Sequence, residues 1–150
     1  MEHDVTAVKN IIAIFLTACV LLATAAAHAD EQRIVIVAST KSGIEAISTK
    51  EVRRAYLGAS IVLDDVEIKP LLNQTDLLAE EVFLQKVLFM SGQAYERQRI
   101  THSFRGGTSP RVYQTPAALL DALQNDSAAI TFMLYGTAVT TPEIRIIGNP

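Results

Sequence analysis

Cysteine is almost absent from this sequence, since Cys19 is the only one in 150 residues. Because Cys19 lies inside an apolar segment near the N-terminus, residues 30–150 contain no thiol. Disulfide bonds and thiolate metal sites are therefore excluded for that part of the chain. Its stability must come from the packing of side chains.

Groups that would mark an enzyme or a nucleic-acid partner are also scarce. The formal net charge is −3, which provides no basic surface for nucleic acid. Residues 30–150 hold one histidine, His102, near the end of an expected helix where the dipole favours a cation. The acidic pairs 64–65 and 80–81 are adjacent in sequence, so their side chains diverge on a turn or a helix. We therefore expect no catalytic residues, metal or cofactor. The only sequence feature in favour of a hydrolase is the content of Ser and Thr.

The N-terminal segment has the order of a cleavable signal peptide. Lys9 precedes an apolar run, residues 11–27, and the small-x-small sequence 27–29 follows it. This pattern predicts a signal peptide at residues 1–29, with cleavage after Ala29. Residues 30–150 would then be an exported, periplasmic domain.

Two other interpretations of this segment remain open. Residues 16–19 resemble a lipobox, which would place an acyl chain on Cys19, although the apolar run continues beyond it. The other is an uncleaved membrane anchor, because the apolar run is about as long as the shortest helices that span a membrane. The acidic Glu2 and Asp4 do not suit a signal peptide, and they suggest a true start at Val8. Contact with a membrane is expected only through this segment.

Strands alternate with helices along residues 30–150. Apolar runs rich in β-branched residues predict strands at 33–38, 128–133 and 144–147, and a hairpin at 61–68 that Pro70 confines to an edge or a strand end. Capping residues and helical spacing predict helices at 48–58, 76–90, 91–102 and 115–125. In the second helix Leu77, Leu84, Val87 and Leu88 should share the buried face. We therefore expect one α/β domain with a mixed sheet flanked by helices.

One loop has the composition of an anion cradle. Glycines expose backbone N–H groups, and hydroxyls and arginines add donors and charge. The residues are Arg105, Gly106, Gly107, Thr108, Ser109 and Arg111. The same residues also suit a helix C-terminus followed by a loop that Pro110 stops, and without a Walker lysine this second interpretation is favoured.

The order of these segments resembles the phosphate-binding proteins of ABC transporters, which have the type 2 periplasmic binding fold. The resemblance rests on segments with matching order and spacing: residues 34–37, 48–58, 83–88, 104–111 and 128–133. Members of that family close two lobes on their ligand, and this chain has length for about one. The resemblance implies a single lobe, similar to the second lobe with its returning strand.

The same resemblance implies a degenerate phosphate site. The position of the family's arginine falls on Asn73, and its hydroxyl cluster falls on residues 77–79. Asp76, Glu80 and Glu81 crowd a helix start whose dipole would otherwise attract an anion. We therefore expect weak phosphate binding or none.

The sequence favours a non-enzymatic solute-binding protein of this kind, whose ligand is a small solute, with an anion among the options. Ligands of open α/β sheets collect beyond the carboxyl ends of strands. Polar residues after the first predicted strand and before the helix at 76–90 form a candidate rim: Ser39, Thr40, Ser42, Asn73, Gln74 and Thr75. These residue types also form turns and caps, so a structural role stays open. The alternative function is an adaptor that docks an exposed apolar face on an envelope partner, such as a sensor, porin or transporter.

Overall fold

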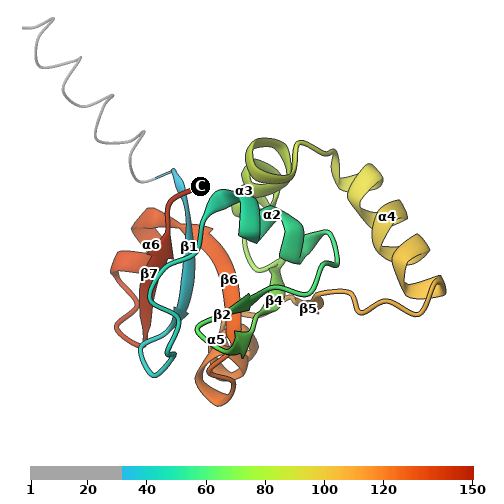
Figure 1. Cartoon of the computed structure of the whole chain (residues 1–150). Helices are drawn as coiled ribbons and strands as arrows, with labels where there is room; N and C mark the ends of the chain where they lie inside the picture. Colours follow the sequence, from blue (N-terminus) through green and yellow to red (C-terminus); the bar gives the residue numbers. More distant parts are fainter. Residues whose placement is uncertain (1–31) are drawn as a thin grey trace, which may run out of the picture. The chain divides into compact units, whose positions relative to one another are not determined.

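The computed structural model describes residues 32–150, and the compact unit considered below spans Ile34–Pro150 (Figure 1). The predicted signal peptide, the acylation of Cys19 and the alternative start at Val8 lie outside the described residues. Within residues 32–150, no helix combines the length and apolar character that a membrane span requires.

The centre of the unit is a five-stranded mixed sheet with the strand order β5-β4-β6-β1-β7. Strand β4 is parallel to both β5 and β6, whereas β1 is antiparallel to β6 and β7. A separate two-stranded hairpin is formed by β2 and β3. The strands are β1 (Ile34–Ser39), β2 (Val62–Leu63), β3 (Val66–Glu67), β4 (Lys69–Asn73), β5 (Arg111–Tyr113), β6 (Ala129–Leu134) and β7 (Ile144–Gly148). The predicted α/β class with a mixed sheet is confirmed.

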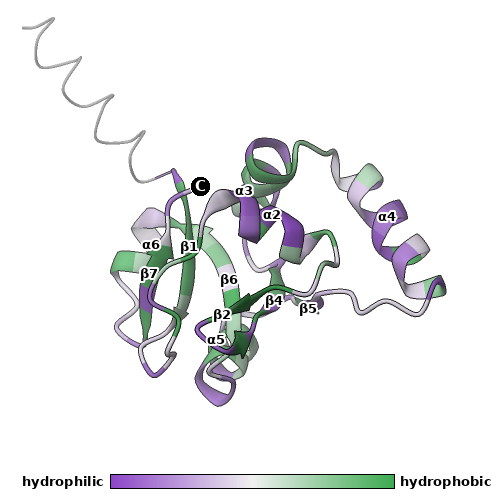
Figure 2. Ribbon diagram, in the orientation of Figure 1, coloured by the Kyte–Doolittle hydropathy of each residue, from purple (hydrophilic) through white to green (hydrophobic). Residues whose placement is uncertain are grey.

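Helices cover both faces of the sheet because β1 and β6 are apolar on both sides (Figure 2). Ile34 and Ile36 of β1 face one core cluster, with residues of α2, α3 and η1, whereas Val35 and Val37 face the other, with α5 and α6. The helices are α2 (Thr49–Tyr56), α3 (Leu77–Phe83), η1 (Leu84–Leu88), α4 (Gly92–Phe104), α5 (Pro116–Asn125) and α6 (Tyr135–Val139).

The predicted helix starts are confirmed by their capping hydrogen bonds. Ser48 and Glu51 form a complete capping box at α2, in which each side chain accepts a hydrogen bond from the backbone N–H of the other. Ser91 caps α4 and Thr115 caps α5. These signals are local, so they can be recognised without knowing the fold.

Strand β4 was not predicted, and it lies inside the sheet rather than at its edge. Pro70 predicts that the second strand of the hairpin lies at an edge of a sheet or ends here, because proline has no N–H to donate. The structure accommodates it: Pro70 pairs only with Ile130 of β6, and pairing with β5 begins one residue later, at Leu71. The short strand β5 and the helix α6 were also missed.

The expected burial of Leu77 is wrong, since its side chain is 78% exposed. Leu77 is the first residue of α3, and Ala79 and Phe83 form the buried stripe there. The following turn, η1, is a π-helix, whose wider turn changes the phase of the stripe so that residues 84, 87 and 88 are buried. A constant period of 3.6 residues therefore fails across this segment.

Phe89 ends this helix in the left-handed conformation, with φ 57° and ψ 42°. The ring is 68% exposed, and the guanidinium carbon of Arg53 lies 4.9 Å from its centroid. A non-glycine residue in this conformation costs roughly 1–2 kcal/mol, which glycine avoids.

We expect a Phe89→Gly variant to be about 1 kcal/mol more stable than Phe89→Ala, because both lose the ring and only glycine relieves the backbone. Urea denaturation of the two variants measures this difference directly. Equal midpoints with equal slopes would mean that the left-handed residue is not strained.

Candidate functional site

The topology of the sheet singles out the carboxyl ends of β4 and β6. These neighbouring strands are parallel, and the chain leaves β4 toward β5 on one side but leaves β6 toward β7 on the other. Adjacent parallel strands whose connections run in opposite directions form a switch point, where open α/β sheets leave a crevice for ligands.

A pocket of about 110 Å³ lies at this switch point. It is lined by the last residues of β4 and β6, by the loop after β4, by residues of α3, α5 and α6, and by Thr141 after α6. The polar lining residues are Asn73, Thr75, Asp76, Thr137 and Thr141, and the apolar ones are Ala79, Pro116, Leu119, Leu120, Met133 and Leu134. No lysine or arginine is among them. The lining of the pocket is therefore mostly apolar, and its one ionisable group is a carboxylic acid.

Asn73 connects the ends of the two strands. Its side chain is buried, and its Nδ2 donates a hydrogen bond of 2.9 Å to the carbonyl of Phe132 in β6. Its Oδ1 accepts hydrogen bonds from the backbone N–H and the hydroxyl of Thr75, at 3.0 and 2.7 Å. The amide of Asn73 thus shapes the wall of the pocket through contacts within the protein.

Asp76 occupies the N-terminus of α3. Its Oδ1 accepts hydrogen bonds from the backbone N–H groups of Leu78 and Ala79, at 2.9 and 3.1 Å. The donors that a bound anion would need at this helix end are therefore already occupied by a carboxylate. Gln74, the third candidate in this loop, is not part of the pocket lining and donates to Glu80 at 2.8 Å.

The loop at 39–42, which was expected to complete the rim, does not lie at the switch-point pocket. The prediction of a single rim is therefore wrong. Ala38 and Pro70 are both paired with Ile130, so the end of β1 is level with the start of β4. Since β1 runs antiparallel to β4 and β6, its carboxyl end reaches the opposite edge of the sheet. Ser39, Thr40 and Ser42 therefore do not meet Asn73, Gln74 and Thr75.

The first loop makes its own structural hydrogen bonds. The Ser42 hydroxyl donates to the carbonyl of Ser127 at 2.6 Å, and the Thr40 hydroxyl donates to the carbonyl of Glu143 at 3.3 Å. The half-buried guanidinium of Arg145 also donates to the carbonyls of Ser42 and Ile44. Sequence reasoning missed Arg145, although a single charge within the apolar strand at 144–147 was an available signal.

The glycine-containing loop after α4 has already used the backbone donors proposed for an anion. The N–H groups of Arg105 and Gly107 donate to the carbonyl of His102, at 3.1 Å each, and that of Gly106 donates to Ser103 at 3.0 Å. These bonds cap the helix, in agreement with the favoured interpretation. Anion binding at this loop stays a prediction that would depend on the exposed side chains of Arg105 and Arg111.

Two further residues of that loop contact α4. The hydroxyl of Ser109 lies 2.9 Å from that of Ser103, and Thr108 lines a small crevice with His102. The imidazole of His102 packs directly on Gly58 and Gly107, where an added Cβ atom would lie 2.5 and 2.1 Å from its Nε2. His102 is therefore a packing residue between two glycines.

Two tyrosines link α4 to the core beneath this crevice. The Tyr95 hydroxyl donates to the carbonyl of Tyr56 at 3.0 Å, and the Tyr56 hydroxyl donates to the carbonyl of Leu71 at 2.9 Å. Burial raises the pKa of both hydroxyls well above the usual range for tyrosine. Both stay protonated at neutral pH and act as hydrogen-bond donors that fix α2 and α4 to the sheet.

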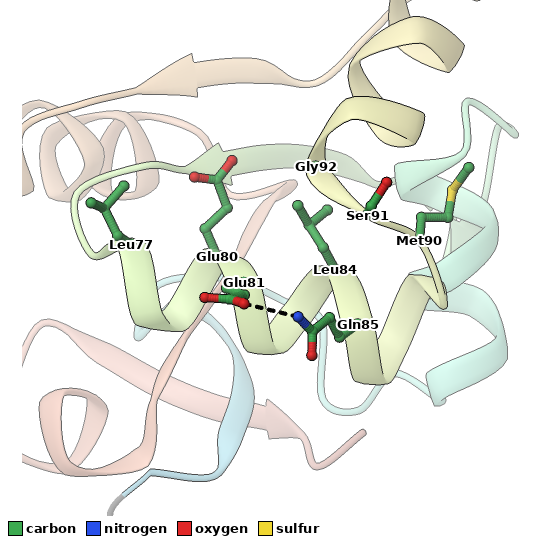
Figure 3. A pocket seen from close by; sticks show the side chains of 8 residues that line it. All are labelled: Leu77, Glu80, Glu81, Leu84, Gln85, Met90, Ser91 and Gly92. Carbon is green, nitrogen blue, oxygen red and sulfur yellow. Dashed lines mark hydrogen bonds between the residues drawn. The ribbon is translucent and has the colours of Figure 1, made fainter.

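A second hollow, of about 340 Å³, lies on the outer side of α3 and η1 (Figure 3). We call it the α3 groove, and its lining residues are Leu77, Glu80, Glu81, Leu84, Gln85, Met90, Ser91 and Gly92. It is acidic, with apolar side chains between the carboxylates. Among the described residues, no group of three or more His, Cys, Asp and Glu side chains is placed to hold a metal ion.

Comparison with solved structures shows the same fold in phosphate-transport receptors. An ABC-type phosphate transport receptor from Vibrio cholerae matches with a TM-score of 0.55 and 10% identity over 77% of this chain. A protein described as a phosphate ABC transporter substrate-binding protein, from Clostridium perfringens and with bound phosphate, matches with a TM-score of 0.54 and 10% identity over 77% of this chain. The predicted resemblance in fold is confirmed.

The likeness covers less than half of those proteins, since this chain spans 45% and 44% of their lengths. No protein-family model and no curated protein matches the sequence.

Proposed function

We propose that this protein is a single-lobe, non-enzymatic solute-binding protein whose ligand site is the pocket at the β4/β6 switch point. The observation that carries the proposal is the position of this pocket, beyond the carboxyl ends of two parallel strands with diverging connections. The fold shared with phosphate-transport receptors supports it. Export to the periplasm belongs to the proposal and rests on the pattern of residues 1–29.

The lining of the pocket selects the class of solute. Apolar side chains, among them Pro116, Leu119 and Met133, make up most of the lining, and hydroxyl and amide groups and the carboxylate of Asp76 complete it. A cavity of about 150 Å³ accommodates benzene, so a pocket of about 110 Å³ suits a ligand, or part of one, of similar or smaller size. We infer a small neutral or cationic solute with one apolar side.

Four probes of comparable size test this inference: inorganic phosphate, glycerol, 1-butanol and butylamine. We expect a thermal shift with one of the neutral or cationic probes and none with phosphate. A Thr137→Leu substitution should abolish the shift, because it fills the pocket. The matched control is Thr140→Leu, at the C-terminal cap of the same helix but outside the pocket lining. A shift with phosphate alone, or one that Thr137→Leu leaves intact, would contradict the proposal.

The second candidate function is an adaptor that docks on an envelope protein. Large apolar side chains that remain exposed favour it, with Phe89 at 68% and Phe104 at 88%. The genes beside this one would separate the two functions: permease genes favour a solute receptor, and sensor or porin genes favour an adaptor.

A further inference from the structure

Helix α4 uses only one side to contact the rest of the unit. Tyr95 is its one buried residue, and the crevice formed with residues 56–58 and 108–110 is lined from α4 by Tyr95, Gln98, Arg99 and His102. In Figure 1 the helix reaches out beyond the sheet and the other helices of the unit. Its opposite side is therefore left without a partner.

That opposite side carries an apolar and basic ridge. Arg97, Ile100 and Phe104 follow one another at spacings of three and four residues, so their side chains share one stripe of the helix. Ile100 is 47% exposed and Phe104 is 88% exposed. The side chain of Arg97 is exposed and has no ion pair or hydrogen bond within residues 32–150. We call these three residues the α4 ridge.

The α3 groove has the complementary character. Its apolar lining residues are Leu77, which is 78% exposed, and farther along the groove the largely buried Leu84 and the half-buried Met90, and Glu80 lies between Leu77 and Leu84 (Figure 3). The carboxylate of Glu80 accepts a hydrogen bond from the neutral amide of Gln74, and that of Glu81 accepts one from the amide of Gln85. Neither carboxylate has a cationic partner within the part of the chain that the structure describes.

The ridge cannot reach the groove of its own molecule. Ser91 and Gly92, at the start of α4, form the rim of the groove, and Tyr95 anchors α4 with the ridge facing outward. The charges and apolar groups of the two surfaces nevertheless match: arginine and aromatic on one, carboxylate and aliphatic on the other. Because the α4 ridge and the α3 groove are complementary but cannot meet within one molecule, they point to a second copy of the same chain as the occupant of the groove.

We propose that two copies associate through reciprocal contacts, with the α4 ridge of each seated in the α3 groove of the other. A two-fold arrangement makes both contacts at once and leaves neither surface open, whereas a one-way contact would continue into a filament. Phe104 is the central anchor of each contact, and Arg97 lies against Glu81 at its rim. The inference does not rest on the proposed solute site, because no lining residue of that pocket also lines the α3 groove.

Sedimentation velocity of the protein expressed from the full 150-residue chain tests the association. We expect a monomer–dimer equilibrium with a dissociation constant on the order of micromolar, weakened by salt because the rim contacts are charged. Phe104→Asp should weaken it at least about 30-fold, as expected for a buried aromatic anchor. The matched control is Val62→Asp, a site 59% exposed on the hairpin, which should change nothing.

Exchanging the charges of Arg97 and Glu81 tests whether these two side chains meet in the dimer. Arg97→Glu and Glu81→Arg should each weaken the dimer, and the variant that carries both should recover it, since the ion pair is then restored in the opposite sense. A protein that stays monomeric up to about 1 mM, a concentration far above that expected for specific association, would overturn the proposal. So would a dimer that these variants leave intact, or a monomer that binds anionic lipid vesicles through Phe104.

Discussion

Replacing Phe83 by alanine should lower the free energy of unfolding by about 3–5 kcal/mol, the range typical of a buried phenylalanine. The ring is fully buried and stacks on Phe132, with centroids 3.9 Å apart and planes 5° from parallel. It also meets the ring of Tyr56 edge-on, at 4.7 Å. These three rings join α3, β6 and α2, so a cavity at Phe83 would loosen all three elements.

Urea denaturation at low protein concentration measures this loss. The matched control is Phe104→Ala, the same chemical change at a side chain that is 88% exposed. It should stay within about 0.5 kcal/mol of the parent protein, as exposed substitutions usually do. If the two variants lost similar stability, the aromatic cluster would not be the centre of the core.

The elements that the sequence predicted correctly are those with local signals. The capping box at Ser48 and Glu51 and the apolar run of β1 carry their information within a few neighbouring residues. Strand β4 carries no such signal. Pro70 predicts the end of a strand, and only two apolar residues, Leu71 and Leu72, follow it. It becomes an interior strand only through pairing with β5 and β6, which are far away in sequence.

The candidate site was predictable in part for the same reason. The loop at 73–75 was identified, and the structure places Asn73 and Thr75 in the switch-point pocket. The loop at 39–42, which follows the first predicted strand, was assigned to the same rim as residues 73–75, which precede the predicted helix at 76–90. The direction of β1 relative to β4 is a property of the whole sheet, and no local pattern reveals it.

Titration of the protein with inorganic phosphate should give no measurable binding at micromolar concentrations. A buried phosphate dianion needs charge-assisted donors to replace its hydration, and arginine provides the strongest of these. The switch-point pocket has no arginine or lysine in its lining. Each missing hydrogen bond to a charged group removes about 1.5–3 kcal/mol, so the loss of several weakens binding by many factors of ten.

Asp76 further disfavours phosphate binding, because its carboxylate repels an anion and already accepts hydrogen bonds from the backbone N–H groups of Leu78 and Ala79. Asp76→Asn keeps a side chain that caps the helix and removes the negative charge. We expect this variant to fold normally and to gain at most about tenfold in phosphate affinity, since one repulsion is removed and no cationic donor is added. Isothermal titration calorimetry of both proteins gives the answer. Micromolar binding by the parent that Asn73→Ala abolishes would mean that a phosphate site persists at this edge of the sheet without an arginine.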